Sequence, residues 1–132
     1  MNSTTKHPRP LSPFWNYRWQ YSNTLSILNR LTGCALSVGL ILFVYWLIAA
    51  ASGEASYANA QTVFAHPLTK LVLFGFSFAF FYHLANGIRH LVWDTGRGLE
   101  RSAARTSGWV AFVGSVVLTI LFWALVLAGG AA

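Results

Sequence analysis

The sequence predicts an all-α integral membrane protein whose three transmembrane helices form an up-down-up bundle. The chain has 132 residues, of which 55% are hydrophobic and only 9% are charged. Three apolar stretches, Leu31–Ala51, Leu71–Ile88 and Trp109–Leu127, each reach the length of about 18 residues that crosses a bilayer as a helix. So many spans in a short chain leave no room for a water-soluble catalytic domain. We therefore expect a three-helix anchor over residues 23–132, preceded by a basic and aromatic segment over residues 1–22.

The N-terminal segment, residues 1–22, has the composition of a membrane–water interface. Pro10 and Pro13 oppose a helix and favour an extended path. Aromatic residues interleaved with polar ones follow, namely Phe14, Trp15, Tyr17, Trp19 and Tyr21. The adjacent span favours the headgroup layer as their environment over a platform for stacking nucleic-acid bases. The segment lacks the apolar core of a signal peptide, so we expect the first span to be a retained anchor.

The three helices are expected at about residues 24–51, 68–95 and 107–128. Asn23 or Thr24 is predicted to cap the first helix. Pro67 suits the first turn of the second helix, and Gly96 and Gly98 favour its end. The helices are therefore predicted to be joined by two modest loops.

The distribution of charge predicts the orientation in the membrane. The net charge is +6, and the basic residues gather before the first span and after the second, as Lys6, Arg9, Arg18, Arg30, Arg89, Arg97, Arg101 and Arg105. The first loop, Ser52–Lys70, carries only Lys70 against Glu54. Because cytoplasmic loops are enriched in Lys and Arg, we expect the N terminus and the second loop, Arg97–Ser107, in the cytoplasm of a bacterial-type cell, and the C terminus in its periplasm. The excess of basic residues is thus explained by the orientation of the protein in an inner membrane, and it does not predict a nucleic-acid partner.

His83 lies inside the second span, where an ionisable side chain is costly and usually functional. Small residues continue its row along the helix, namely Gly75, Ala79 and Gly87. They form a shelf on which a planar haem bound to His83 could lie, with Arg89 and His90 within reach of its propionates. His90, two turns away on the same face, cannot bind the same iron. The same pattern also fits a histidine hydrogen-bonded between closely packed helices.

A second group of polar residues lies at the start of the first helix, in the stretch Ser26–Arg30. Ser26 and Arg30 are four residues apart and so share a helix face. A hydroxyl and a guanidinium at this position could bind the carbonyl oxygen of a membrane quinone and stabilise its reduced, negatively charged forms. The spacing fits equally an Arg30 that reaches lipid phosphates and a Ser26 bonded to the helix backbone.

Three blocks of sequence together resemble the cytochrome b anchor subunit of succinate dehydrogenase, respiratory complex II. These blocks are Arg9–Pro13 (RPLSP), Ser26–Gly33 (SILNRLTG), and His83–Asp94 (HLANGIRHLVWD) with Gly96. They occur in the family's order and at its spacing, and the resemblance extends through all three spans. It implies a place in a larger hetero-oligomeric helix bundle, with a flavoprotein, an iron–sulfur protein and a second small membrane anchor as partners.

The resemblance also implies roles for individual residues. His83 matches the family's haem-ligating histidine, and the second axial histidine of a shared haem b would come from the other anchor. His90 and Arg30 match residues near the haem propionates, while Ser26, Ile27 and Arg30 match the quinone site. Succinate would be oxidised on the flavoprotein, so no catalytic residue is expected in this chain. Electrons from the tricarboxylic acid cycle would pass through iron–sulfur clusters to ubiquinone in the respiratory chain.

Two positions depart from the family pattern, and other functions fit part of the sequence. Asn29 and Phe14 stand where many members have histidine. Asn29 can donate a hydrogen bond but carries neither charge nor a labile proton near neutral pH. The alternatives are a fumarate reductase anchor, a haem-free subunit that only tethers a complex, and a small transporter. We rank the transporter last because no acidic residue lies inside a span.

Overall fold

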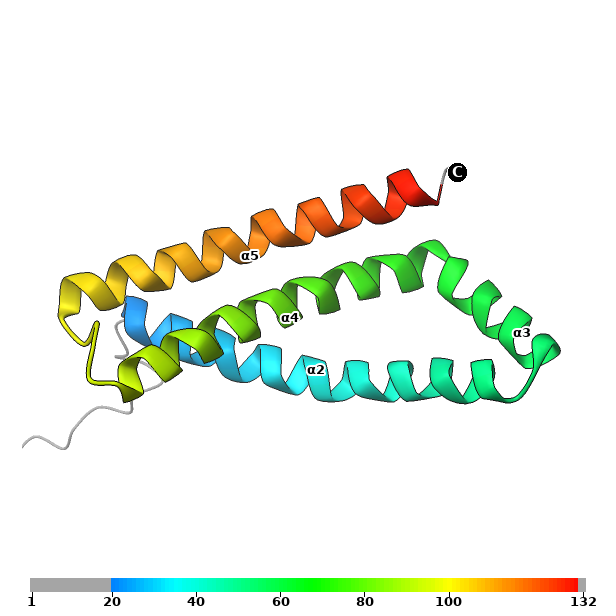
Figure 1. Cartoon of the computed structure of the whole chain (residues 1–132), viewed down its shortest axis with the longest axis horizontal. Helices are drawn as coiled ribbons and strands as arrows, with labels where there is room; N and C mark the ends of the chain where they lie inside the picture. The colour runs from blue at the N-terminus through cyan, green and yellow to red at the C-terminus, as the bar shows by residue number, and fades with distance from the viewer. Residues whose placement is uncertain (1–19, 131–132) are drawn as a thin grey trace, which may run out of the picture.

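The computed structural model describes residues 20–130, which form four consecutive helices (Figure 1). These are α2 at Tyr21–Ala51, α3 at Glu54–Ala65, α4 at Pro67–Asp94 and α5 at Arg101–Gly129. Because α2, α4 and α5 are long and apolar enough to cross a membrane, the predicted all-α architecture with three spans is confirmed. The Arg9–Pro13 block, Phe14 and most of the predicted N-terminal segment lie outside the described residues.

Helix α4 is the central element of the bundle and packs against both α2 and α5 (Figure 1). The three spans meet at one end, where α2 begins, α4 ends and α5 begins. Toward the other end α2 and α4 separate, and α3 bridges the gap between them. The large side chains on the outward faces are mostly apolar and exposed, as expected for helices that are covered by lipid or by partner helices.

The helix α3 is not predicted by hydropathy, and the expectation of a simple loop between the first two spans is wrong here. Gly53 separates α3 from α2 with a φ of 106°, a conformation that glycine adopts without strain. Two aromatic pairs then hold α3 against α2, Trp46 with Tyr57 and Tyr45 with Phe64. With 12 residues, many of them small or polar, α3 is too short and not apolar enough to be recognised as a transmembrane span.

The boundaries of α4 agree with the prediction. Pro67 occupies its first turn, and the Nδ1 of His66 accepts a hydrogen bond from the backbone N–H of Leu68 at 3.2 Å. The helix ends at Asp94, and Gly96 and Gly98 follow with φ of 78° and 71°. Glycine therefore turns the chain back toward α5, as the sequence indicates.

The starts of α2 and α5 differ from the prediction. Gln20, and neither Asn23 nor Thr24, is the N-cap of α2, and the Thr24 hydroxyl donates to the Gln20 carbonyl at 3.2 Å. Helix α5 begins at Arg101, six residues before the expected position 107, because its polar first turns favour a helix without adding to the apolar span. The second loop is therefore shorter than the predicted Arg97–Ser107.

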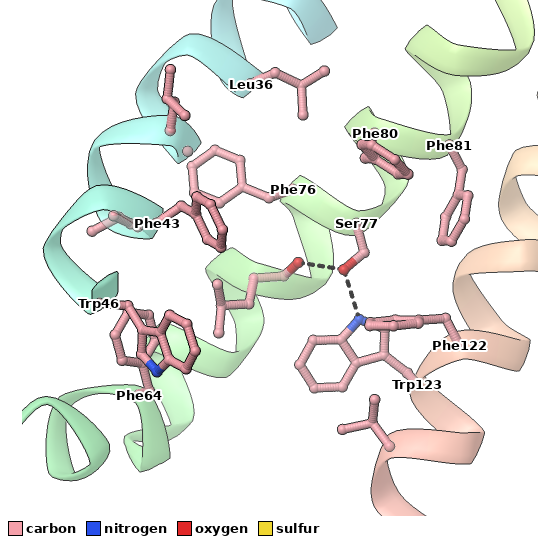
Figure 2. Close-up of a pocket in the computed structure, with 15 residues that line it drawn as sticks. Leu36, Phe43, Trp46, Phe64, Phe76, Ser77, Phe80, Phe81, Phe122 and Trp123 are labelled. Carbon is pink, nitrogen blue, oxygen red and sulfur yellow. Dashed lines mark hydrogen bonds between the residues drawn. The ribbon is translucent and has the colours of Figure 1, made fainter. Parts of the chain in front are cut away.

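An apolar cavity of about 740 Å³ occupies the end of the bundle where α2 and α4 separate (Figure 2). All four helices contribute to its lining, which includes the aromatic side chains of Phe43, Trp46, Phe64, Phe76, Phe80, Phe81, Phe122 and Trp123. The hydroxyl of Ser77 donates to the carbonyl of Leu73 at 2.8 Å and accepts from the indole N–H of Trp123 at 3.1 Å (Figure 2). These two polar side chains are therefore paired with each other.

At the opposite end, a glycine allows α2 to approach α5. A Cβ built on Gly108 would lie 2.5 Å from Cδ1 of Leu25 and 2.6 Å from the hydroxyl of Tyr21. Tyr21 also stacks on Trp109, with ring centroids 5.6 Å apart, and donates to the Arg105 carbonyl at 3.1 Å. A side chain at position 108 would therefore push these helices apart.

We expect Gly108→Val to lower the stability of the assembled protein by about 1–3 kcal/mol, the usual cost of overpacking a close contact. Thermal denaturation of the purified complex would measure it. Gly114→Val on the same helix is the matched control, because a Cβ at Gly114 has no atom within 4 Å. Equal midpoint temperatures for the two variants would contradict the close approach.

Candidate functional site

The imidazole of His83 projects from α4 toward α2 and is hydrogen-bonded there. Its Nδ1 lies 3.2 Å from the backbone carbonyl oxygen of Asn29 and 3.4 Å from Oγ1 of Thr32. A carbonyl oxygen only accepts hydrogen bonds, so Nδ1 carries the proton and donates it to Asn29. The lone pair of the neutral ring is then on Nε2. Metal-binding histidines commonly adopt this arrangement, with one ring nitrogen held by a carbonyl and the other facing the metal.

The predicted row of small residues beside His83 is only partly open. Ala79 is buried within the bundle, so it does not extend an open shelf. A Cβ built on Gly75 or Gly87 would have no neighbouring atom within 4 Å, so the space above these two glycines is open. Among residues 20–130, Nε2 of the half-buried His83 has no hydrogen-bond partner, and the space at Gly87 is open, so this position fits the requirements of a haem ligand.

This part of the chain offers a metal a single ligand at this position. Residues 20–130 contain no group of three or more His, Cys, Asp or Glu side chains that could hold a metal ion. His90 lies exposed two turns along α4, with its ring edge-on to Trp93 at a centroid distance of 5.1 Å. A six-coordinate iron on His83 could therefore not take its second axial ligand from His90.

Arg89 joins α4 to α5, a role that the sequence analysis did not foresee. Its Nε donates to the hydroxyl of Ser107 at 2.9 Å, and a terminal nitrogen donates to the carbonyl of Ala104 at 2.6 Å. The other terminal nitrogen donates to Oδ1 of Asn86 at 3.3 Å, and the guanidinium lies 4.0 Å from the ring centroid of Trp93. Each of the three nitrogens of Arg89 thus makes one hydrogen bond, and two of these bonds hold α4 against α5 as a clamp.

Ser26 and Arg30 lie on one exposed flank of α2, beside the strip that contacts α4. Leu25 and Thr32 on that strip are buried, whereas Ser26 and Arg30 are exposed and Ile27 is half-buried. Within residues 20–130 the Ser26 hydroxyl forms no bond to the helix backbone, and the Arg30 guanidinium has no hydrogen-bond partner. With respect to residues 20–130, both groups are therefore open to a ligand or partner at this end of the bundle.

The structure brings His83 next to the Ser26–Arg30 stretch, although they lie far apart in the sequence. The carbonyl that holds His83 belongs to Asn29, the residue directly before Arg30. The side-chain Oδ1 of Asn29 is buried and has no partner among residues 20–130. A buried unpaired amide oxygen costs about 1–3 kcal/mol, so this position is suited to a further hydrogen-bond donor.

A second buried polar pair supports the same region, and the sequence analysis missed it. Tyr82 and Asn86 are 0% and 2% exposed. The Tyr82 hydroxyl donates to the carbonyl of Leu25 at 3.4 Å, and Asn86 accepts from Arg89. Tyr82 and Asn86 are four residues apart and so share a face of an apolar helix next to His83. This spacing of two polar side chains could have predicted the pair from the sequence.

These features define a class of protein, a helical membrane subunit with three spans and a hydrogen-bonded histidine inside its second span. The chain belongs to the succinate dehydrogenase/fumarate reductase transmembrane subunit family, whose model matches residues 5–122. It is therefore a multi-pass membrane anchor of complex II, which works with catalytic partner subunits.

Individual relatives cover most of the chain. The succinate dehydrogenase cytochrome b556 subunit of Rickettsia felis is 44% identical over 117 residues, which are 87% of this chain and 90% of the relative. The protein of the same name from Paracoccus denitrificans is 39% identical over 122 residues, 92% and 94% of the two chains. The mitochondrial cytochrome b560 subunit of Sus scrofa is 37% identical over 115 residues, 85% of this chain and 68% of the relative.

The clamp formed by Arg89 is testable apart from any ligand. Arg89→Gln should lower the stability of the complex by about 2–3 kcal/mol, because hydrogen bonds from a charged donor are lost at the α4–α5 junction. Thermal denaturation would measure the change, with the exposed Arg97→Gln as the control. A stability equal to that of the control, together with loss of a bound chromophore, would instead identify Arg89 as a ligand contact.

Proposed function

We propose that this chain binds one side of a b-type haem through Nε2 of His83 and forms part of a quinone site in a succinate:quinone oxidoreductase. The observation that carries the proposal is the hydrogen bond from Nδ1 of His83 to the Asn29 carbonyl, which leaves Nε2 to bind iron. The relatives named as cytochrome b subunits support a haem in this family.

The residues around His83 would hold the haem without further ligands from this chain. A haem supplies one-electron redox chemistry when it is bound. The exposed cationic or polar side chains of Arg30 and His90 would offset the charge of the propionates. The second axial ligand would come from the second small anchor subunit, since His90 is two turns away on the same helix as His83.

The quinone site is proposed around Ser26, Ile27 and Arg30. The Ser26 hydroxyl would donate a hydrogen bond to a quinone carbonyl, Arg30 would stabilise the negative charge that develops on reduction, and Ile27 would contact the ring. A guanidinium does not release a proton in proteins, and Asn29 has none to give. The two protons taken up with two electrons would therefore come from water or from a partner subunit, with Ser26 and Arg30 orienting ubiquinone.

The placement of charge supports an orientation of the chain in the membrane, and this orientation suggests where the partner subunits would lie. With the N terminus in the cytoplasm of a bacterial inner membrane, the end that carries Ser26, Arg30 and His90 faces the cytoplasm and the C terminus faces the periplasm. An iron–sulfur subunit docked on that side would deliver electrons near the quinone. A flavoprotein would carry out the dicarboxylate chemistry. Lipid and the second small anchor would cover the apolar outer faces.

The family description also includes fumarate reductase, but the relatives reported above are all succinate dehydrogenase subunits. We therefore assign the direction from succinate to quinone. A haem-free tethering subunit is the remaining alternative, and the absorbance of the purified complex separates it from the proposal.

Replacing the proposed iron ligand should remove the haem from the site. In the purified complex His83→Ala is expected to abolish or shift the reduced-minus-oxidised b-type spectrum, because no other side chain of residues 20–130 is placed to substitute. His90→Ala keeps the axial ligand and should keep a b-type spectrum. An unchanged spectrum in an assembled His83→Ala complex would disprove the assignment of His83.

Replacing Arg30 should impair electron transfer to ubiquinone and leave succinate oxidation intact. Arg30→Leu is expected to lower ubiquinone reduction by about tenfold or more, since a charge-assisted hydrogen bond contributes about 1.5–3 kcal/mol. Succinate oxidation with a soluble acceptor that bypasses the quinone should stay normal. Arg97→Leu in the second loop is the matched control. Normal quinone kinetics and inhibitor binding in Arg30→Leu would exclude Arg30 from the site.

A further inference from the structure

Gly33 on α2 lies so close to the imidazole of His83 that a larger residue at position 33 would displace the ring. A Cβ built on Gly33 would lie 3.1 Å from Cε1 of the imidazole, 3.6 Å from Nδ1 and 4.0 Å from Nε2. The first distance is shorter than an ordinary van der Waals contact, so even alanine would require the ring to move. The backbone of α2 therefore limits how close the imidazole lies to that helix.

Thr32 restrains the same ring through its hydroxyl. Thr32 is 5% exposed, and its Oγ1 donates to the Asn29 carbonyl at 2.9 Å while lying 3.4 Å from Nδ1 of His83. The carbonyl that accepts from His83 is thereby fixed by a second donor. Thr32 thus restrains the hydrogen-bonded edge of the ring, and Gly33 restrains its distance from α2.

We infer that Gly33 and Thr32 are positioning residues that set the direction in which Nε2 of His83 faces its iron. The inference rests on the proposed haem ligation by His83. Glycine inside a helix is less favourable than alanine by about 1 kcal/mol, so its presence at position 33 needs a compensating role. Close approach of the ring provides that role, because a shifted or rotated imidazole would change both the hydrogen bond to Asn29 and the iron–nitrogen direction.

Gly39 provides a matched comparison on the same helix. A Cβ built on Gly39 would lie 3.3 Å from Cδ1 of Phe76, so the crowding is similar but involves a ring in the apolar cavity. Gly33→Ala and Gly39→Ala gain the same helix propensity and add the same methyl group. They differ mainly in which ring the methyl group displaces.

The experiment compares these two variants as intact, purified complexes. The readouts are the electron paramagnetic resonance spectrum of the oxidised haem, its midpoint potential, and the haem content per assembled complex. We expect Gly33→Ala to shift the resonance and the potential and to weaken haem retention by about tenfold, as loss of support around a metal ligand typically does. Gly39→Ala should leave the resonance and the potential as in the wild type.

A spectrum and potential of Gly33→Ala equal to those of the wild type would overturn the inference, and so would equal changes in both variants. If Gly33→Ala does not assemble, the pair Thr32→Val and Thr32→Ser decides. The shape-conserving valine should shift the resonance and serine, which keeps the hydroxyl, should restore it; a wild-type spectrum in Thr32→Val would overturn the inference. Retention of the haem spectrum in His83→Ala would instead remove the proposed function itself.

Discussion

The hydrogen bond from the imidazole of His83 to the carbonyl of Asn29 is the interaction on which the candidate site depends. It fixes the tautomer of the ring, and it joins α4 to α2 at the point where both carry their polar residues. In hydrocarbon an unpaired polar group costs several kcal/mol, so the pairing specifies how the two helices meet. Gly33 permits the approach and Thr32 holds the same carbonyl, so neighbouring residues in the sequence serve one contact.

Helix α4 connects this contact to the rest of the bundle. Tyr82 donates to the backbone of α2, and Arg89 donates to α5, so polar contacts from a single helix fix both neighbours at the same end. The opposite end is held by aromatic and aliphatic contacts around a cavity (Figure 2). Directional bonds therefore predominate where the candidate site lies, whereas at the cavity end apolar packing predominates and is supplemented by the Trp123–Ser77 hydrogen bond between α5 and α4.

The sequence alone was sufficient for the three spans and for the ends of α4. Apolar length reports transmembrane helices directly, and the proline at position 67 and the glycines at 96 and 98 mark the ends of α4 by their backbone preferences. It was insufficient for α3 and for the first turns of α5, because hydropathy measures preference for lipid and not the ability to form a helix. These segments are helical with small and polar side chains.

The contacts between residues on different helices also could not be predicted from the sequence. Spacing placed Ser26 with Arg30 on one face, since that depends only on the helical repeat. It did not show that Asn29 holds His83, that Gly33 lies under the ring, or that Arg89 is occupied by α5. Each of these depends on how two helices cross, and residue spacing within one helix contains no information about the other.

The hydrogen-bonded pair of Ser77 and Trp123 in the cavity affects how readily water and protons could pass through this part of the subunit. A water molecule in a protein interior needs two to four polar partners. In the cavity Trp123 donates to Ser77, and the Ser77 hydroxyl donates to the Leu73 carbonyl. The Ser77–Trp123 pair therefore leaves few free hydrogen-bonding groups for a chain of water molecules in this cavity. Under the proposed function, we therefore expect the protons of quinol formation to enter from the end that carries Ser26 and Arg30, where the electrons also arrive.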